Sequence, residues 1–184
     1  MSTYVALLRG INVGKAKRIA MADLRALLGD LGYTDVATLL NSGNVVFKAS
    51  TGTPKKLAAD ISAAIATRLG IEVPVIVISA RVLALIAREN PFANTADDPS
   101  RLLVAFVADA NVLAAMSAMS AIAPHVRAPE QFHIGSQAAY LHCASGILES
   151  KAAEALLGKA GKAATTRNWA TVQKLQALVE KVQR

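Results

Sequence analysis

The stretch that decides the fold runs from Val36 to Phe47 and reads VATLLNSGNVVF. Two short apolar segments, Val36–Leu40 and Val45–Phe47, flank the tetrapeptide Asn41-Ser42-Gly43-Asn44. Glycine and asparagine tolerate the positive φ angles of tight turns, and apolar, partly β-branched residues fill the flanking segments. The pattern therefore predicts an antiparallel β-hairpin.

The segments on either side give this hairpin a place in a larger unit. Before it we expect an apolar strand over residues 3–8 and a helix over 21–31. After it we expect a helix over Pro54–Leu69, ended by Gly70, and a strand over 73–78. The resulting order, βαββαβ, is that of a ferredoxin-like unit.

The same pattern begins again beyond a helix over 80–89 and a polar linker, Asn94–Ser100. The second set comprises a strand over 102–107, a helix over 111–120, a hairpin over 130–134 and 138–143, a helix over 150–158, a short strand over 163–167 and a final helix over 169–182. We therefore predict an α+β protein with two ferredoxin-like (βαββαβ) halves, each with an antiparallel sheet, plus a C-terminal helix. The expected division is a first half over 1–79, a helix and linker over 80–100, and a second half with the C-terminal helix over 101–184.

Composition and charge limit the classes of protein to which this chain can belong. Of its 184 residues 53% are hydrophobic, which supplies ample core and excludes a disordered chain. The formal net charge is +7, and the excess lies at the two ends, with +4 over residues 1–25 and +5 over 151–184. Such a charge favours anionic small molecules or nucleic acid as partners, by long-range attraction.

The single cysteine and the lack of long apolar segments indicate the cellular compartment of the protein. Cys143 is the single cysteine, so neither an intrachain disulfide nor a cysteine-based metal cluster can form. No two histidines have the spacing of a metal-binding helix, and we expect neither a metal nor a cofactor. The chain starts without a signal-peptide pattern, and no window approaches ~18 uninterrupted apolar residues. We expect a cytoplasmic protein with no membrane contact.

Alternation along the second hairpin assigns its side chains to two faces of the sheet. One face carries Phe132, Ile134, Ala139, Leu141 and Cys143. The other carries Gln131, His133, Tyr140 and His142. The first set is apolar, so we expect it in the core, with Cys143 as a buried small hydrophobe rather than a nucleophile. The second set could line an open sheet face that stacks bases, as in RNA-binding proteins, but the aromatic and basic strand signature of those proteins is missing. We therefore expect a solvated face or an interface between the halves.

The most informative motif for function follows the first strand. It reads Arg9-Gly10-Ile11-Asn12-Val13-Gly14, and Lys15, Lys17 and Arg18 come directly after it. The glycines allow a tight turn and a close approach to a ligand, and the cations favour an anion. The spacing is neither that of a nucleotide P-loop nor that of a dinucleotide-binding motif. An anion-binding loop and a purely architectural connection are both open interpretations.

The predicted topology places this motif beside the hairpin turn. In a ferredoxin-like unit the chain reverses after every strand, so the loop after the first strand and the turn of the hairpin lie at one end of the sheet. Ser42 and Asn44 would then face Arg9, Asn12 and Lys15 and complete one pocket. Turn geometry alone also accounts for Ser42 and Asn44, and both interpretations stay open.

A second polar block, Thr165-Thr166-Arg167-Asn168-Trp169, precedes the last helix. Asn168 has the character of a helix cap and Trp169 that of a core anchor, whereas Thr166 and Arg167 have no comparable structural reason. Backbone donors at a helix N-terminus favour an anion. If the two ends of the chain meet, Arg9 and Arg167 would hold one phosphate or carboxylate from opposite sides.

Five blocks of the sequence carry a family resemblance. They are Leu7–Gly14, Met21–Arg25, Asn41–Phe47, Asn90–Phe92 and Thr165–Leu175. Together they resemble the bacterial family known as domain of unknown function 1697. The resemblance implies an alpha-plus-beta fold and a small cytoplasmic protein, and it implies no established activity.

This chain departs from that family's pattern in two places. Lys15 stands where a second glycine often follows Gly14. The turn over Ser145–Ala152 retains Ser150 and Lys151 but lacks the leucine that usually follows them.

From these observations we hypothesise that the protein binds a phosphate-bearing or other anionic ligand, a nucleotide or nucleic acid. The candidate ligand-binding residues are Arg9, Asn12, Lys15, Ser42, Asn44, Lys151, Thr166, Arg167 and Asn168. One alternative is an enzyme acting on a small anionic substrate, with Lys151 or Asp23 as the proton-transfer group. The other is a protein-interaction module without a small-molecule site.

Overall fold

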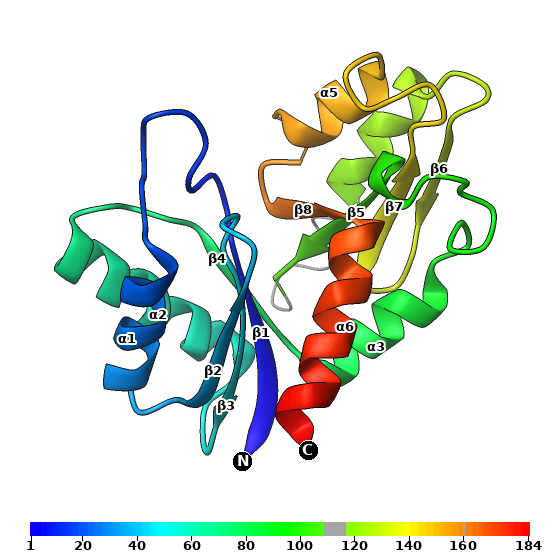
Figure 1. The fold of residues 1–184 in the computed structure, drawn as a ribbon. Coiled ribbons are helices and arrows are strands. Elements are labelled where there is room, and N and C mark those ends of the chain that lie inside the picture. Colours follow the sequence, from blue (N-terminus) through cyan, green and yellow to red (C-terminus); the bar gives the residue numbers. More distant parts are fainter. Residues whose placement is uncertain (109–116, 160) are drawn as a thin grey trace. The chain divides into compact units, whose positions relative to one another are not determined.

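The computed structural model of the protein describes residues 1–108, 117–159 and 161–184 (Figure 1). Two compact units make up the chain: Met1–Leu83 together with Lys174–Arg184, and Ala84–Gln173. The boundaries fall inside two helices, α3 (Ala80–Glu89) and α6 (Trp169–Gln183). The last helix, which the sequence analysis assigns whole to the second half, is thus divided between the units.

The first unit has the predicted order of elements. These are β1 (Ser2–Leu8), α1 (Met21–Asp30), β2 (Thr34–Leu39), β3 (Asn44–Ala49), α2 (Pro54–Leu69) and β4 (Val75–Ser79). The strands are hydrogen-bonded in the order β2-β3-β1-β4, and all three neighbouring pairs are antiparallel. The ferredoxin-like prediction for this half is confirmed.

Both helices that follow strands of this unit, α1 and α2, cover the same face of its sheet (Figure 1). The buried side chains between them and the sheet include Leu24, Leu27 and Leu28 of α1, Leu57, Ile61 and Ile65 of α2, and Ala6, Leu8, Val45, Phe47 and Val77 of the strands. Each fully buried large apolar side chain contributes about 1.5–3 kcal/mol to stability. This layer is therefore what holds the loops at the ends of the sheet in place.

The second unit repeats the strand order of the first. Its strands are β5 (Leu102–Val107), β6 (Gln131–Ile134), β7 (Ala138–His142) and β8 (Ala164–Asn168), paired antiparallel in the order β6-β7-β5-β8. Residues from α5 (Lys151–Leu157) and from the 3-10 segment Ser120–His125 join its core. Residues 117–119 are helical, and the rest of the helix predicted over 111–120 lies almost wholly outside the described residues. The predicted antiparallel sheet of the second half and the C-terminal helix are confirmed.

None of the helices in the described part of the chain is both long enough and apolar enough to cross a membrane.

The β6–β7 hairpin confirms the expected core face, and on the other face, where Gln131 and His133 are exposed, it corrects the expectation for Tyr140. Ala139, Leu141 and Cys143 are fully buried in the core, and burial raises the pKa of the Cys143 thiol to about 11, as expected for a buried hydrophobe. Tyr140, expected on a solvated face or between the halves, is also fully buried. Its hydroxyl donates a hydrogen bond to the backbone oxygen of Ile86, 2.7 Å away, and Ile86 lies in the part of α3 that belongs to the second unit.

Gly43 allows the β2–β3 turn to pack against the end of β1. Its φ angle is +82°, and its carbonyl oxygen accepts a hydrogen bond from the Leu8 amide at 2.8 Å. A Cβ atom at this position would lie 2.6 Å from Leu8 Cβ and 2.9 Å from Ile11 Cδ1. The turn therefore requires glycine for two reasons, conformation and space.

We predict that Gly43→Ala lowers the free energy of unfolding by about 2–5 kcal/mol, because a left-handed alanine costs about 1–2 kcal/mol and overpacking adds about 1–3. Gly10→Ala is the matched control, since Gly10 has a φ of +69° and nothing lies within 4 Å of its added Cβ. Gly10→Ala should lower the free energy of unfolding only by the conformational cost of about 1–2 kcal/mol. Urea denaturation followed by circular dichroism measures both, and equal losses would show that the close approach at Gly43 is not a constraint.

Candidate functional site

Three connections of the first unit meet at one end of its sheet. They are the Gly10 loop (residues 9–20), the Asn41 turn (residues 40–43) and the segment just before β4. The Arg9 amide donates to the Pro74 oxygen at 3.0 Å, and Asn12 Nδ2 donates to the Asn41 oxygen at 2.7 Å. The prediction that the Gly10 loop and the hairpin turn lie side by side is confirmed. Figure 1 shows the Gly10 loop extending beyond the end of the sheet.

The carboxamide of Asn12 fastens this loop. Its Nδ2 donates to the backbone oxygens of both Ile19 and Asn41, at 2.9 and 2.7 Å. Its Oδ1 accepts from the Ile19 amide at 2.9 Å, and its own amide donates to the Lys17 oxygen at 3.1 Å. The φ angle of Asn12 is +55°, a conformation that asparagine tolerates better than most residues. One side chain therefore closes the loop on itself and joins it to the turn.

A hollow of about 400 Å³ lies where the loop, the turn and the start of α1 come together. We name it the Asn12 hollow, and its lining is Asn12, Arg18, Ile19, Ala20, Met21 and Asn41. α1 begins here with Ala20 as its N-cap residue, and no side chain caps it. An N-cap without a side-chain acceptor leaves the first-turn amides of a helix to other acceptors, such as an anion. Arg18 supplies a positive charge at the same place.

The remaining cations of the loop lie outside this hollow. Lys17 lines a separate hollow of about 590 Å³, together with residues of α2 and the segment Glu72–Pro74. Lys15 is exposed, and Arg9 is half-buried beside Pro74. Of the residues proposed from the sequence, the Asn12 hollow thus contains Asn12 but neither Arg9 nor Lys15. Arg18, which the sequence analysis noted only as a charge, is the cation that lines it.

The two predicted residues of the turn differ in their surroundings. Asn44 is fully buried, and its Nδ2 donates to the Leu39 oxygen at 2.9 Å and to Ser42 Oγ at 3.0 Å. Ser42 is exposed and accepts that hydrogen bond. Neither residue lines the Asn12 hollow. Both hydrogen bonds of Asn44 stabilise the turn itself, which is the architectural interpretation of this motif.

The remaining candidate ligand-binding residues belong to the second unit: Lys151, Thr166, Arg167 and Asn168. Lys151 is exposed and forms an ion pair with Glu154 at 2.9 Å, and the hydrogen bond that its amine donates to the Glu154 carboxylate raises the pKa of that amine. A lysine whose pKa is raised is protonated at neutral pH and is a poor general base. Asp23, the other candidate for proton transfer, is exposed in the first turn of α1, in the first unit.

The structure confirms that Asn168 caps α6, and it does not test whether Arg9 and Arg167 bind one anion together. Asn168 Oδ1 accepts from the Thr171 amide at 2.9 Å, so Asn168 caps α6 as predicted. Arg167 Nη1 donates to Thr165 Oγ1 at 2.9 Å and to the oxygen of Thr166 at 2.8 Å. Burial lowers the pKa of Arg167 to about 10, and the guanidinium stays charged at neutral pH. Because Arg9 and Arg167 belong to different units, their joint hold on one anion stays a prediction.

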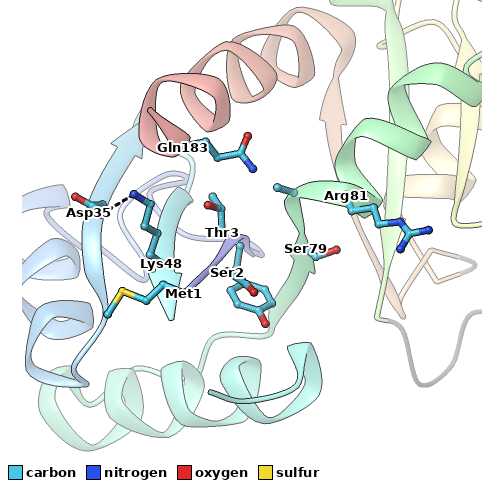
Figure 2. A pocket seen from close by; sticks show the side chains of 10 residues that line it. Met1, Ser2, Thr3, Asp35, Lys48, Ser79, Arg81 and Gln183 are labelled. Atoms are coloured by element: carbon cyan, nitrogen blue, oxygen red, sulfur yellow. Dashed lines mark ion pairs between the residues drawn. The ribbon is translucent and has the colours of Figure 1, made fainter. Parts of the chain in front are cut away.

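A third hollow, of about 720 Å³, lies at the opposite end of the first sheet. Its lining is Met1, Ser2, Thr3, Tyr4, Asp35, Lys48, Ser79, Ala80, Arg81 and Gln183. In Figure 2 the Lys48 amine reaches toward Asp35, with which it forms an ion pair at 3.1 Å, and the Arg81 guanidinium points away from the other labelled side chains. The charge of Lys48 is therefore already matched, which makes this hollow a weaker anion site than the Asn12 hollow.

Across residues 1–108, 117–159 and 161–184, no three His, Cys, Asp or Glu side chains are grouped so that they could hold a metal ion.

We predict that Asn12→Asp lowers the free energy of unfolding by about 1–3 kcal/mol, because a carboxylate cannot donate to the oxygens of Ile19 and Asn41. Asparagine and aspartate share the tolerance for positive φ, so only the donors change. At acidic pH the difference in unfolding free energy between Asn12→Asp and the wild type should become smaller. The protonated carboxyl group of the variant then has one O–H that can donate to a backbone oxygen. Asn41→Ala is the control, since Asn41 accepts through its backbone. Unchanged stability in Asn12→Asp would refute the fastening role.

The comparisons with known proteins establish a family and a fold, and they name no activity. A conserved bacterial protein from Streptococcus pneumoniae has a similar structure, with a TM-score of 0.80 and 20% sequence identity over 97% of this chain and 98% of that one. At this identity the likeness establishes the fold alone. No curated protein matches the chain. The family described as "Protein of unknown function (DUF1697)" matches residues 1–140, which include the Gly10 loop and the Asn41 turn. The chain therefore belongs to the DUF1697 family.

Proposed function

We propose that this protein binds a phosphate-bearing ligand in the Asn12 hollow. The observation that carries the proposal is the start of α1, which opens on the hollow without a side-chain cap and beside Arg18. The first amides of a helix and its dipole favour negative charge, and this combination is a common way of binding phosphate. A guanidinium adds charge-assisted hydrogen bonds to phosphate oxygens.

The charge of the surrounding chain supports the same ligand class. Arg9, Lys15, Lys17 and Arg18 lie within ten residues, and no acidic residue precedes Asp23. The excess of cations raises the local concentration of anions and speeds their encounter with the site. Asp23 works against binding, because its carboxylate occupies the first turn of α1. Nucleotides and nucleic acids carry the phosphate groups that fit this arrangement.

An enzyme is less well supported by the same residues. Lys151, one of the two candidate proton-transfer groups, lies in the second unit and has a raised pKa. The loop site therefore offers positive charge and donors rather than a matched acid and base. We also propose a cytoplasmic location, supported by a single cysteine that is buried in the core.

We predict that inorganic phosphate and adenosine monophosphate raise the melting temperature of the protein, and that Arg18→Gln weakens this binding about tenfold, the value of one charge-assisted hydrogen bond. Asp23→Asn should tighten it, because a repulsive carboxylate is removed. Lys55→Gln is the control, since it removes the same charge at the exposed start of α2.

A thermal-shift titration of the four proteins measures these affinities. Binding of equal strength in the wild type and Arg18→Gln, or no shift with either phosphate compound, would refute the proposed site.

A further inference from the structure

The Gly10 loop projects a prong that is closed at its base. The bonds of Asn12 to Lys17 and Ile19 close the loop at its base, and every residue from Val13 to Arg18 is exposed. We call residues 13–18 the prong. A closed base lowers the conformational entropy that the prong would lose on binding, which is the benefit of a preorganised contact.

The cations of the prong reach two different hollows. Arg18 lines the Asn12 hollow, whereas the adjacent Lys17 lines the hollow beside α2 and Pro74. Lys17 has a φ angle of +50°, and this left-handed turn helps neighbouring side chains to diverge. A ligand with a single phosphate can engage only one of these hollows. A ligand with successive phosphates can engage both, against the opposing charge of Glu72, which also lines the Lys17 hollow.

Apolar side chains accompany these cations. Val13, in the prong, is 72% exposed, and Leu40, in the Asn41 turn, is 50% exposed. Leu40 also has a φ of +57°, which is strained for a leucine, and such strain often marks functional segments. Residues 9–20 and 40–43 include no aromatic side chain, so the stacking platforms of many single-strand binders are missing from these loops.

We propose that the prong binds the sugar-phosphate backbone of a nucleic acid, with Arg18 and Lys17 contacting successive phosphates and Val13 packing against sugar or base edges. The inference rests on the proposed phosphate site and names its ligand as a polymer rather than a mononucleotide. Charge favours this partner, since the loop carries four cations and no acid. Without aromatic platforms on these loops, recognition by backbone geometry is the available mode.

The test is a fluorescence anisotropy titration at several salt concentrations, with labelled oligonucleotides of RNA and DNA, single-stranded and double-stranded. Each lost phosphate contact should lower the slope of log K against log salt by about 0.7 for a single strand or about 0.9 for B-DNA. We expect Lys17→Gln and Arg18→Gln each to lower the slope by this amount, and the double variant to lower it by the sum of the two. Val13→Ser should weaken binding without changing the slope, and Lys55→Gln should change neither by a comparable amount.

The same variants separate the inference from the proposed function. If Arg18→Gln weakens adenosine monophosphate and the oligonucleotide alike while Lys17→Gln has no effect, the site takes one phosphate and the prong proposal is wrong. If no oligonucleotide binds more tightly than the mononucleotide, the proposal is also wrong, and an acidic protein becomes the partner to examine. If both substitutions reduce the salt slope but the mononucleotide does not bind, the polymer proposal stands and the small-ligand site does not.

Discussion

The hydrogen bonds of the Asn12 carboxamide are the interaction on which the candidate site depends. They join residues seven positions apart, Asn12 and Ile19, and they tie both to the backbone of Asn41 in the next connection of the sheet. They act beside the burial of Ile11 and Ile19, which anchors the two ends of the loop in the core. Asn12, in a left-handed conformation, lines the hollow itself and closes the base of the loop from which the prong projects.

The same hydrogen bonds hold together a segment that charge would drive apart. Four cations between Arg9 and Arg18 repel one another, and the exposed segment 13–18 gains little stability from burial to offset the repulsion. Gly43 contributes from the other side, because its close approach to Leu8 and Ile11 brings the turn within reach of Asn12. An anion at this end would relieve the repulsion, so ligand binding and loop stability are expected to rise together.

Sequence patterns predict most of the fold and only part of the site. The glycine that ends α2, the Asn168 cap and the order of elements in the first unit follow from local signals. The direction of each loop side chain does not, because left-handed residues at Asn12 and Lys17 redirect the chain. Arg18 therefore takes the place that spacing assigned to Arg9 and Lys15. Tyr140 is a second example. Alternation along the strand predicts which face of the sheet its side chain lies on, but it does not predict that α3 covers that side chain.

Amide hydrogen exchange of Ile19 in the protein without any ligand is the most direct measurement of this fastening. Ile19 lies next to a run of exposed residues, and its amide donates to Asn12 Oδ1 at 2.9 Å. If that hydrogen bond fixes the loop, the amide is protected and exchanges much more slowly than it would in an unfolded peptide. Exchange at the unfolded rate would mean that the loop opens freely and that no preformed site exists there.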